Sequence, residues 1–142
     1  NTGFIYFMGL GDGYVYRNEN AYDFTSFIGV GNFFPGDPAD YSRCGHIILA
    51  NNGRIIFGYG GYLRYTDDLF NSSVDISIET SSNLYFLLYE GGNSILTYIY
   101  NGSSSSCEFY RSLDNGSTWQ YQSVPFGMTT YNSFQDGYIL NI

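Results

Sequence analysis

The chain contains no lysine, and its five basic residues are all arginines, set against 13 acidic residues. The net charge of −8 would repel nucleic acid and anionic membrane surfaces, so we expect neither as a partner. No apolar run approaches the roughly 20 residues that a membrane-spanning helix needs, and no stretch shows helical periodicity. The composition therefore predicts a protein without membrane insertion and without a nucleic-acid partner.

Cysteine is scarce as well, with Cys44 and Cys107 as the only two. Two cysteines without Cys-x-x-Cys spacing, and with only His46 beside them, do not make a zinc signature, so we expect no metal and no cofactor. In an oxidising compartment the pair is a candidate disulfide. Their expected places in different strands leave this open, because a bridge needs Cα atoms within about 7 Å.

Aromatic residues and glycine are abundant, with 16 Tyr, 12 Phe and 18 Gly. Short β-branched and aromatic runs alternate with turns rich in Gly and Asn, which is typical of strands joined by hairpins, as at the Gly58–Gly61 connection. The expected strands lie at residues 46–50, 54–57, 62–65 and 74–78 in one series, and at residues 84–89, 95–100, 108–111 and 120–124 in a second. We therefore expect an all-β protein in a single domain.

One eight-residue motif runs from Ser112 to Trp119 and has the pattern Ser-x-Asp-x-Gly-x-Thr-Trp. Each fixed residue suits a tight hairpin, because Asp114 can accept amide hydrogen bonds as an Asx-turn and Gly116 permits positive φ. The hydroxyls of Ser112 and Thr118 can satisfy further turn groups, and the Trp119 ring can pack between sheets. The motif resembles the Asp-box (BNR repeat) of sialidase-like β-propellers, where it joins the third and fourth strands of a blade.

Two weaker copies precede this motif at intervals of about 47 residues. At the serine and aspartate positions the second copy has Thr66 and Asp68, and the first has Asn18 and Asn20. Both copies lack the glycine and the tryptophan. A repeat of this length is typical of propeller blades, so the resemblance implies a β-propeller-like fold of three four-stranded antiparallel blades.

The two ends of the chain have the pattern of one hairpin. Residues 137–142 followed by residues 1–7 repeat the pattern of residues 45–57, so the N- and C-terminal strands are expected to complete one blade. The predicted blades are residues 1–30 with 134–142 (blade one), residues 43–79 (blade two) and residues 82–125 (blade three). Asn1, in place of an initiator Met, indicates a processed or partial sequence.

Three blades are too few to close a normal propeller, which has about 4–8. A symmetric homodimer would give six blades, whereas a filament or a longer tandem array would supply neighbours by strand exchange. We therefore expect self-association. A structural subunit of a filament is the main alternative to a binding module.

By the same resemblance, ligands would bind on the face formed by the loops after the second and fourth strands. Aromatic, amide and acidic groups gather in these loops, which suits glycan recognition. The candidate ligand-binding residues are Asp12, Asp37, Asp40, Tyr41, Arg43, Tyr59 and Tyr131. The spacing of the three aspartates matches no calcium loop.

Catalytic sialidases carry an Arg-Ile-Pro segment and three arginines that clamp the substrate carboxylate. No arginine here precedes Ile-Pro, and Arg17, Arg54 and Arg111 are expected on the face opposite a propeller active site. We therefore expect no enzyme, and a sialidase-type glycoside hydrolase is the weakest alternative. The sequence favours a lectin-like or adhesive protein that is secreted or exposed on a cell or virion surface.

Three Asn-x-Ser sequons are candidate glycosylation sites, at Asn71, Asn101 and Asn115. All three lie in expected turns, where a glycan would be accommodated. Asn115 also belongs to the eight-residue motif.

Overall fold

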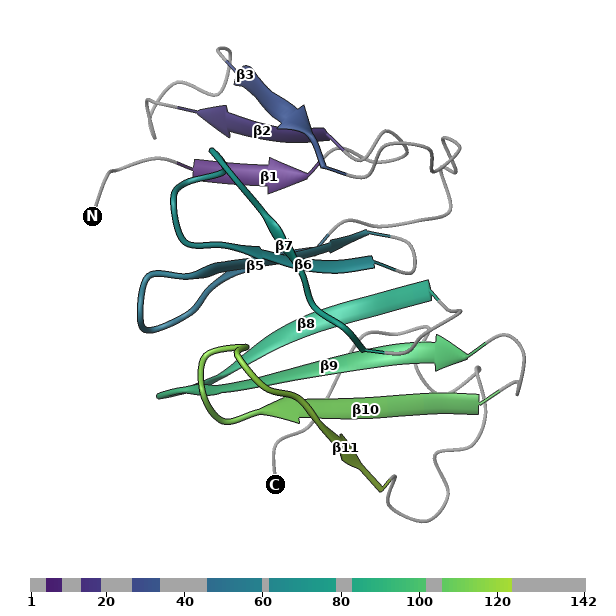
Figure 1. The fold of residues 1–142 in the computed structure, drawn as a ribbon. Helices are drawn as coiled ribbons and strands as arrows, with labels where there is room; N and C mark the ends of the chain where they lie inside the picture. The colour runs from purple at the N-terminus through teal and green to yellow at the C-terminus, as the bar shows by residue number, and fades with distance from the viewer. Residues whose placement is uncertain are drawn as a thin grey trace.

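A computed structural model of the chain describes residues 5–8, 14–18, 27–33, 46–59, 62–78, 83–101 and 106–123. These residues form eleven strands and their turns, without a helix, in three antiparallel sheets that stack on one another (Figure 1). Among them no helix is long and apolar enough to cross a membrane. The prediction of an all-β protein is confirmed.

Each sheet is a meander in which neighbouring strands follow one another along the chain. Sheet 1 contains β1 (Ile5–Met8), β2 (Tyr14–Asn18) and β3 (Phe27–Asn32). Sheet 2 contains β4 (His46–Leu49), β5 (Ile55–Tyr59), β6 (Tyr62–Thr66) and β7 (Val74–Asp75). Sheet 3 contains β8 (Asn83–Gly91), β9 (Ser94–Asn101), β10 (Ser106–Ser112) and β11 (Gln120–Gln122). The strand predicted within residues 134–142 lies outside the described residues.

The strand registers show that the three sheets repeat one unit. The final residues of β2, β6 and β10 pair with isoleucines, in the combinations Asn18 with Ile5, Thr66 with Ile55 and Ser112 with Ile95. All three final residues are polar and at most 2% exposed. Ile5 therefore occupies the position of Ile55, as the alignment of the N-terminal segment with residues 51–57 predicts.

Some strand ends differ from the prediction. β5 continues to Tyr59, which pairs with Tyr62, so the connection predicted at Gly58–Gly61 begins only after Tyr59. β3 runs to Asn32, beyond the predicted end of blade one at residue 30. In both places the backbone ladder extends into glycine-containing segments, because pairing with the adjacent strand outweighs the low strand propensity of glycine.

The fourth strand of sheet 2 is shorter than predicted, because β7 covers only Val74–Asp75. The residues after it still follow the sheet. The Ile76 N–H donates to the Leu63 carbonyl at 2.9 Å, and Ile76 and Ile78 pack on the apolar core. Residues 76–78 thus pack as part of sheet 2 without forming the regular ladder of the predicted strand.

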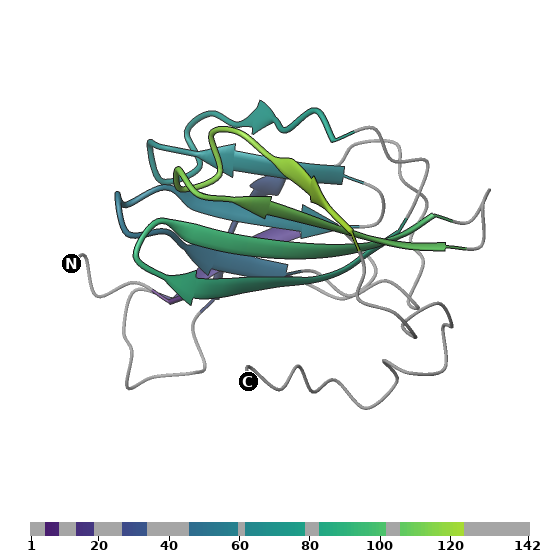
Figure 2. The same cartoon turned by 90° about the horizontal axis from the view of Figure 1, so that it is seen from below.

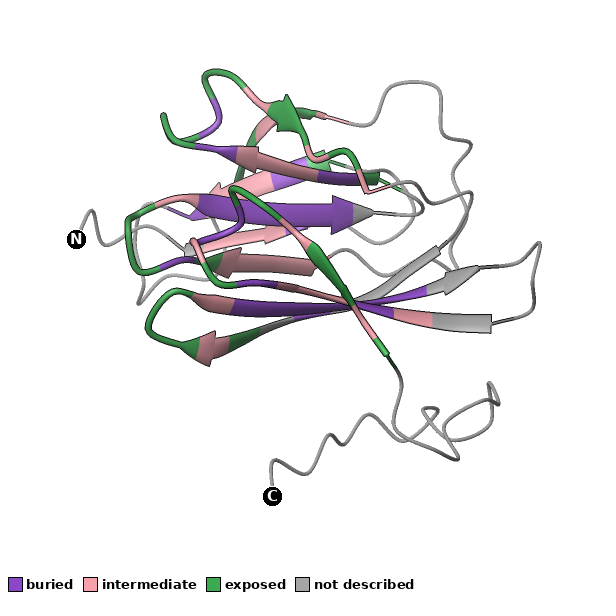
Figure 3. Cartoon of the chain, turned by 60° about the horizontal axis from the view of Figure 1, so that its bottom comes forward, coloured by how far each residue is buried: buried purple, intermediate pink, exposed green. Residues whose placement is uncertain are grey.

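Two apolar clusters hold the stack together, one on each face of sheet 2. The first cluster joins sheets 1 and 2 through Met8, Val15, Ile55, Phe57 and Phe70. The second joins sheets 2 and 3 through Ala50, Ile56, Leu63, Leu87, Ile95 and Ile99. Alternation along β5 sends consecutive side chains to opposite faces, so sheet 2 is apolar on both. Figure 3 shows the buried residues concentrated in the central strands. Burial of each large apolar side chain stabilises the fold by about 1.5–3 kcal/mol relative to leaving that side chain exposed.

Candidate functional site

The hairpins β4–β5 and β8–β9 and the turns β6–β7 and β10–β11 lie at one end of the stack (Figure 2). We call this end the turn face. It consists of residues 50–54, 66–73, 91–94 and 112–119. Most of the polar contacts between different turns of the described chain are found here.

The turn between β10 and β11, residues 112–119, is organised around one carboxylate and is called the Asp114 turn below. Asp114 Oδ1 accepts hydrogen bonds from the Ser112 hydroxyl (2.7 Å) and from the N–H groups of Ser117 (3.0 Å) and Thr118 (2.8 Å). Asp114 Oδ2 accepts from the Thr118 hydroxyl (2.7 Å), and Ser112 Oγ accepts from the Gly116 N–H (2.7 Å). Burial raises the pKa of Asp114, but the hydrogen bonds from Thr118, Ser112 and Ser117 outweigh it and lower the pKa from 3.8 to about 2.

The glycine and tryptophan of this turn act together. Gly116 has φ +81°, and a Cβ at this position would collide with Ile56 Cδ1 of the neighbouring sheet. The Trp119 indole N–H donates to the Gly116 carbonyl at 3.1 Å, and its ring packs on the cluster between sheets 2 and 3. The turn is therefore locked to sheet 2 as well as closed on itself.

The turn between β6 and β7, residues 66–73, repeats most of these hydrogen bonds and is called the Asp68 turn. Asp68 Oδ1 accepts from the Thr66 hydroxyl (2.7 Å) and the Ser72 N–H (2.9 Å), and Asp68 Oδ2 accepts from the Ser72 hydroxyl (2.6 Å). Thr66 Oγ1 accepts from the Phe70 N–H (3.0 Å), as Ser112 does from Gly116. Hydrogen bonds from the hydroxyl and N–H of Ser72, and then from Thr66, lower the pKa of Asp68 from 3.8 to about 2. The weaker copy of the motif thus forms the complete turn.

Phe70 stands where the Asp114 turn has its glycine, with φ +69°. Its ring lies between sheets 1 and 2, with ring centroids 5.1 Å from Tyr6, 5.3 Å from Phe33 and 5.0 Å from Phe57. A left-handed backbone costs a non-glycine residue about 1–2 kcal/mol, and burial of the ring contributes about as much or more. Phe70 therefore fills the space between sheets 1 and 2, as Trp119 does between sheets 2 and 3.

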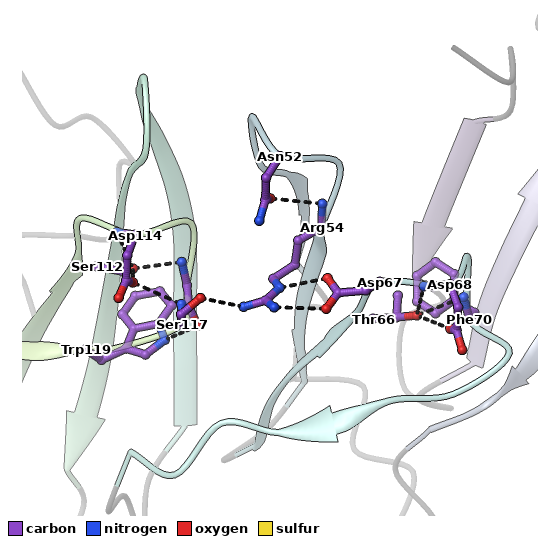
Figure 4. Close-up of polar contacts among 11 residues, drawn as sticks. Asn52, Arg54, Thr66, Asp67, Asp68, Phe70, Ser112, Asp114, Ser117 and Trp119 are labelled. Carbon is purple, nitrogen blue, oxygen red and sulfur yellow. Dashed lines mark hydrogen bonds and ion pairs between the residues drawn. The ribbon is translucent and has the colours of Figure 1, made fainter.

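Arg54, at the end of the β4–β5 hairpin, joins the two turns (Figure 4). Its Nε and Nη2 donate to the two carboxylate oxygens of Asp67 at 2.8 and 2.9 Å, and its Nη1 donates to Ser117 Oγ at 2.9 Å. The guanidinium lies 3.8 Å from the centroid of the Tyr65 ring. The hydrogen bond from Arg54 lowers the pKa of Asp67 and raises that of Arg54. Arg54 thus connects sheet 2 to sheet 3 through the tips of their turns.

We predict that Arg54→Met lowers the free energy of unfolding by about 1–2 kcal/mol, measured by urea denaturation. An ordinary exposed ion pair contributes about 0–1 kcal/mol. The Arg54 side chain is only 13% exposed, bidentate and stacked on an aromatic ring, so its loss should cost more.

Ser117→Ala is the matched control for Arg54→Met, because it removes one hydrogen bond and leaves the pair with Asp67 intact. If Arg54 couples the turns, the double variant loses about 0.5–1 kcal/mol less than the sum of the single variants. Strict additivity would show that the contact between Arg54 and Ser117 has no energetic role.

The other described carboxylates also accept hydrogen bonds. They pair as Glu90 with Arg111 (2.8 Å), Asp75 with Arg64 (2.5 Å) and Glu108 with the Tyr110 hydroxyl (2.9 Å). Arg64 additionally donates to the Phe33 carbonyl, which ties sheet 2 to sheet 1. Every carboxylate in the described ranges is therefore a hydrogen-bond acceptor in the scaffold.

The structure separates the predicted site residues into two groups. Thr66, Asp68, Ser112, Asp114, Gly116, Thr118 and Trp119 lie in the two turns, and Asn18 takes the equivalent buried position in sheet 1. Tyr59 is the last residue of β5, at the end of the sheet opposite the turn face, and Cys107 lies in β10 opposite Tyr100. Asp12, Asn20, Asp37, Asp40, Tyr41, Arg43, Cys44 and Tyr131 lie outside the described residues.

The three sequons have different environments. Asn71 is exposed in the Asp68 turn, and its side-chain NH₂ donates to the Asp68 carbonyl at 2.7 Å. Asn101 is the last residue of β9, where a turn was expected. Asn115 lies in its expected turn, with a positive φ of 56°, but it is buried. Glycosylation at these residues stays a prediction.

Stacked antiparallel sheets that repeat in register are blades of a β-propeller-type fold, and the solved structures similar to this chain agree. One is YCF48 bound to D1 peptide, with a TM-score of 0.59 and 13% sequence identity, which covers 87% of this chain and 39% of that chain. Another is the GH74 xyloglucanase from Xanthomonas campestris, with a TM-score of 0.61 and 18% identity, which covers 85% of this chain and 19% of that one.

The likeness shows the fold alone, because the identities are low. No family model matches the sequence, and no curated protein matches it. The chain spans 39% of the length of one neighbour and 19% of the other.

Proposed function

We propose that the chain is a non-catalytic propeller module of the Asp-box (BNR repeat) type, which binds glycans and self-associates in a lectin-like or adhesive role. The observation that carries the proposal is that the charged side chains of the described residues are engaged in hydrogen bonds and ion pairs within the chain. All six carboxylates there accept hydrogen bonds from neighbouring side chains, and Arg54, Arg64 and Arg111 each pair with one of them. Hydrolysis of a glycoside by two carboxylates needs a general acid and a nucleophile or base facing the substrate. The described carboxylates instead stabilise turns and sheets.

Membership of the Asp-box group is supported by the hydrogen bonds of the two turns. In both, an aspartate accepts hydrogen bonds from a hydroxyl two residues before it and from an N–H four residues after it. The hydroxyl in turn accepts an N–H four residues after itself. This reciprocal pattern uses the serine or threonine and the aspartate of the motif in the roles that a tight hairpin requires.

The ligand is proposed to bind at the end of the stack opposite the turn face. The turn face is built from turns that are closed on themselves and tied together by Arg54, which engages the Asp67 carboxylate and the Ser117 hydroxyl. Tyr59 lies at the opposite end, where β5 finishes, and the other candidate residues lie outside the described residues. Aromatic rings beside amide and acidic groups are suited to the apolar and polar surfaces of a sugar.

Propeller-type proteins differ in what they bind, and the two similar structures are an example. One is described with a bound peptide and the other as a xyloglucanase, so neither fixes the ligand of this chain. A glycan is proposed on the composition of the candidate loops. An exposed location, secreted or on a cell or virion surface, follows from the same proposal.

A structural subunit of a filament or tandem array is the second candidate. It is favoured by the number of sheets that the described residues form, because three blades are fewer than the about 4–8 of a closed propeller. In such an assembly the neighbouring sheets would come from other copies or repeats.

The proposed function is tested by glycan-array binding of the purified chain, followed by titration of the best glycan. We predict that Tyr131→Ala and Asp40→Asn each weaken binding at least 10-fold, whereas Asn52→Ala, a change of an exposed turn-face residue, leaves it unchanged. Chromatography of the glycan after incubation should return it intact. Binding to no glycan would overturn the lectin-like role, and release of a shorter sugar would overturn the non-catalytic assignment.

A further inference from the structure

Sheet 1 forms one end of the described stack, with sheet 2 on one side of it (Figure 1). Tyr6, Met8 and Val15 belong to the cluster between these two sheets. Because side chains alternate along a strand, Phe7 and Tyr14 are directed to the other face. This outer face of sheet 1 has no described sheet against it.

Four aromatic side chains gather on that face. We call Phe7, Tyr14, Tyr16 and Phe27 the outer stripe. The Phe7 ring stacks on Tyr16 at 5.1 Å and meets Phe27 edge-on at 4.5 Å, and Tyr14 lies 6.1 Å from Tyr16. Gly29 of β3 pairs with Tyr16 of β2, and the space that a side chain of residue 29 would occupy is open. Tyr14 is 41% exposed and Phe27 is 39% exposed, so the stripe is accessible.

The register of the repeat shows what kind of surface the outer stripe is. Phe7 occupies the position of Phe57 in sheet 2 and of Thr97 in sheet 3, because each lies two residues after the equivalent isoleucine. Phe57 and Thr97 are both fully buried. Phe57 packs against sheet 1, and Thr97 lies on the face of β9 that packs against sheet 2. The outer stripe is therefore a sheet-packing face, continuous in register with the two interfaces already formed.

The outward face of sheet 3, at the other end of the stack, helps to decide what can pack on the outer stripe. Leu96, Tyr98 and Phe109 are on the outward face of sheet 3, and none of them is more than 8% exposed. Because these three side chains are buried, they are not available to cover the outer stripe of a second copy. An isologous contact, in which both copies offer the same patch, needs only the outer stripe.

Charge favours the same arrangement. Two copies with a net charge of −8 each repel one another over most of their surfaces. The four residues of the outer stripe are uncharged, so contact between two stripes brings no carboxylates of the stripe together. Aromatic side chains also bury the most area per residue, which suits an interface core.

We infer that two copies of the chain pair through sheet 1, with their outer stripes face to face across a two-fold axis. The inference rests on the self-association in the proposed function and names its surface. Two sheets packed in this way lie about 10 Å apart, as in a β-sandwich, with the rings of the two stripes interdigitating.

The test is the native mass of the wild-type chain and of Phe27→Glu and Tyr14→Glu, measured by light scattering over a concentration series. Tyr121→Glu is the matched control, because Tyr121 is 58% exposed on β11, far from sheet 1 in the stack. We expect a wild-type mass of twice 16.0 kDa, and a dissociation constant raised about 100-fold or more in the stripe variants but not in the control. Far-UV circular dichroism checks that each variant is folded.

Hydrogen exchange of the wild-type chain gives a second measurement that needs no variant. Dimer formation should slow exchange in residues 27–32 of the edge strand β3 relative to a dilute sample, with no change in residues 120–122. Stripe variants that remain dimeric would overturn this interface while leaving self-association intact. A monomeric wild type would overturn both, and a monomer whose glycan binding is lost in the stripe variants would make this face a sugar platform.

Discussion

Gly116→Ala is expected to lower the free energy of unfolding by about 2–4 kcal/mol, although it adds a single methyl group. Two effects combine. At φ +81° a Cβ costs about 1–2 kcal/mol, and this Cβ would also collide with Ile56 Cδ1 and lie only 3.3 Å from Ile56 Cγ1. Ile56 is fully buried between sheets 2 and 3, so it can move only by disturbing the core, which costs about 1–3 kcal/mol. Urea denaturation followed by the fluorescence of the single tryptophan measures the effect.

Gly53→Ala separates the two contributions to the Gly116 result. Gly53 has φ +89°, close to that of Gly116, but a Cβ there would meet nothing within 4 Å. The control should therefore lose only the conformational part, about 1 kcal/mol. Equal losses at both glycines would mean that the contact between the Asp114 turn and sheet 2 does not restrict residue 116.

The hydrogen bonds that close the Asp114 turn on itself could be predicted from sequence because they are local. Ser112, Gly116 and Thr118 all lie within four residues of Asp114, so the identity of each residue was enough to assign its role. The register of the repeat could also be predicted, including the place of Ile5, because the same strand pattern recurs at a fixed interval.

The role of Phe70 could not be predicted in the same way. In the sequence, a phenylalanine at the glycine position weakens the motif, since a bulky residue is disfavoured at positive φ. The burial that compensates for this cost depends on contacts with Phe33 and Phe57. Phe33 directly follows β3 of sheet 1, and Phe57 lies in β5 of sheet 2. Only the stacking of sheets 1 and 2 brings these rings together, and the sequence repeat does not specify that packing.

Arg54 is an intermediate case. Its place beside the inner hairpin, next to the turns, follows from the strand pattern and agrees with its contacts on the turn face. Its partners, Asp67 and Ser117, are 13 and 63 residues away and belong to two different turns. A hydrogen bond between turns of adjacent sheets depends on how far the sheets are offset, which is a tertiary property.

Asp114→Ala should lower the free energy of unfolding by about 3 kcal/mol at pH 7, because it removes a charged acceptor of four hydrogen bonds. The buried Ser112 hydroxyl loses its acceptor, whereas the exposed N–H groups of Ser117 and Thr118 can turn to water, which limits the loss. Asp75→Ala is the control. Asp75 is 68% exposed and pairs only at the surface with Arg64, so its removal should cost under about 1 kcal/mol.

The pH dependence of the same variant tests whether the carboxylate acts as a charged acceptor. The pKa of Asp114 is about 2 in the folded chain and 3.8 in an ordinary environment, so its charge stabilises the fold above about pH 4. That stabilisation is lost as the pH falls from 4 towards 2, because the unfolded chain takes up the proton first. The difference in unfolding free energy between the wild type and Asp114→Ala should therefore shrink over this range. A difference that stayed constant from pH 7 to pH 2 would mean that the turn depends on the shape of the side chain and not on its charge. The Asp68 turn remains intact in this variant and has a carboxylate pKa of about 2, so the variant should still lose some stability between pH 4 and pH 2.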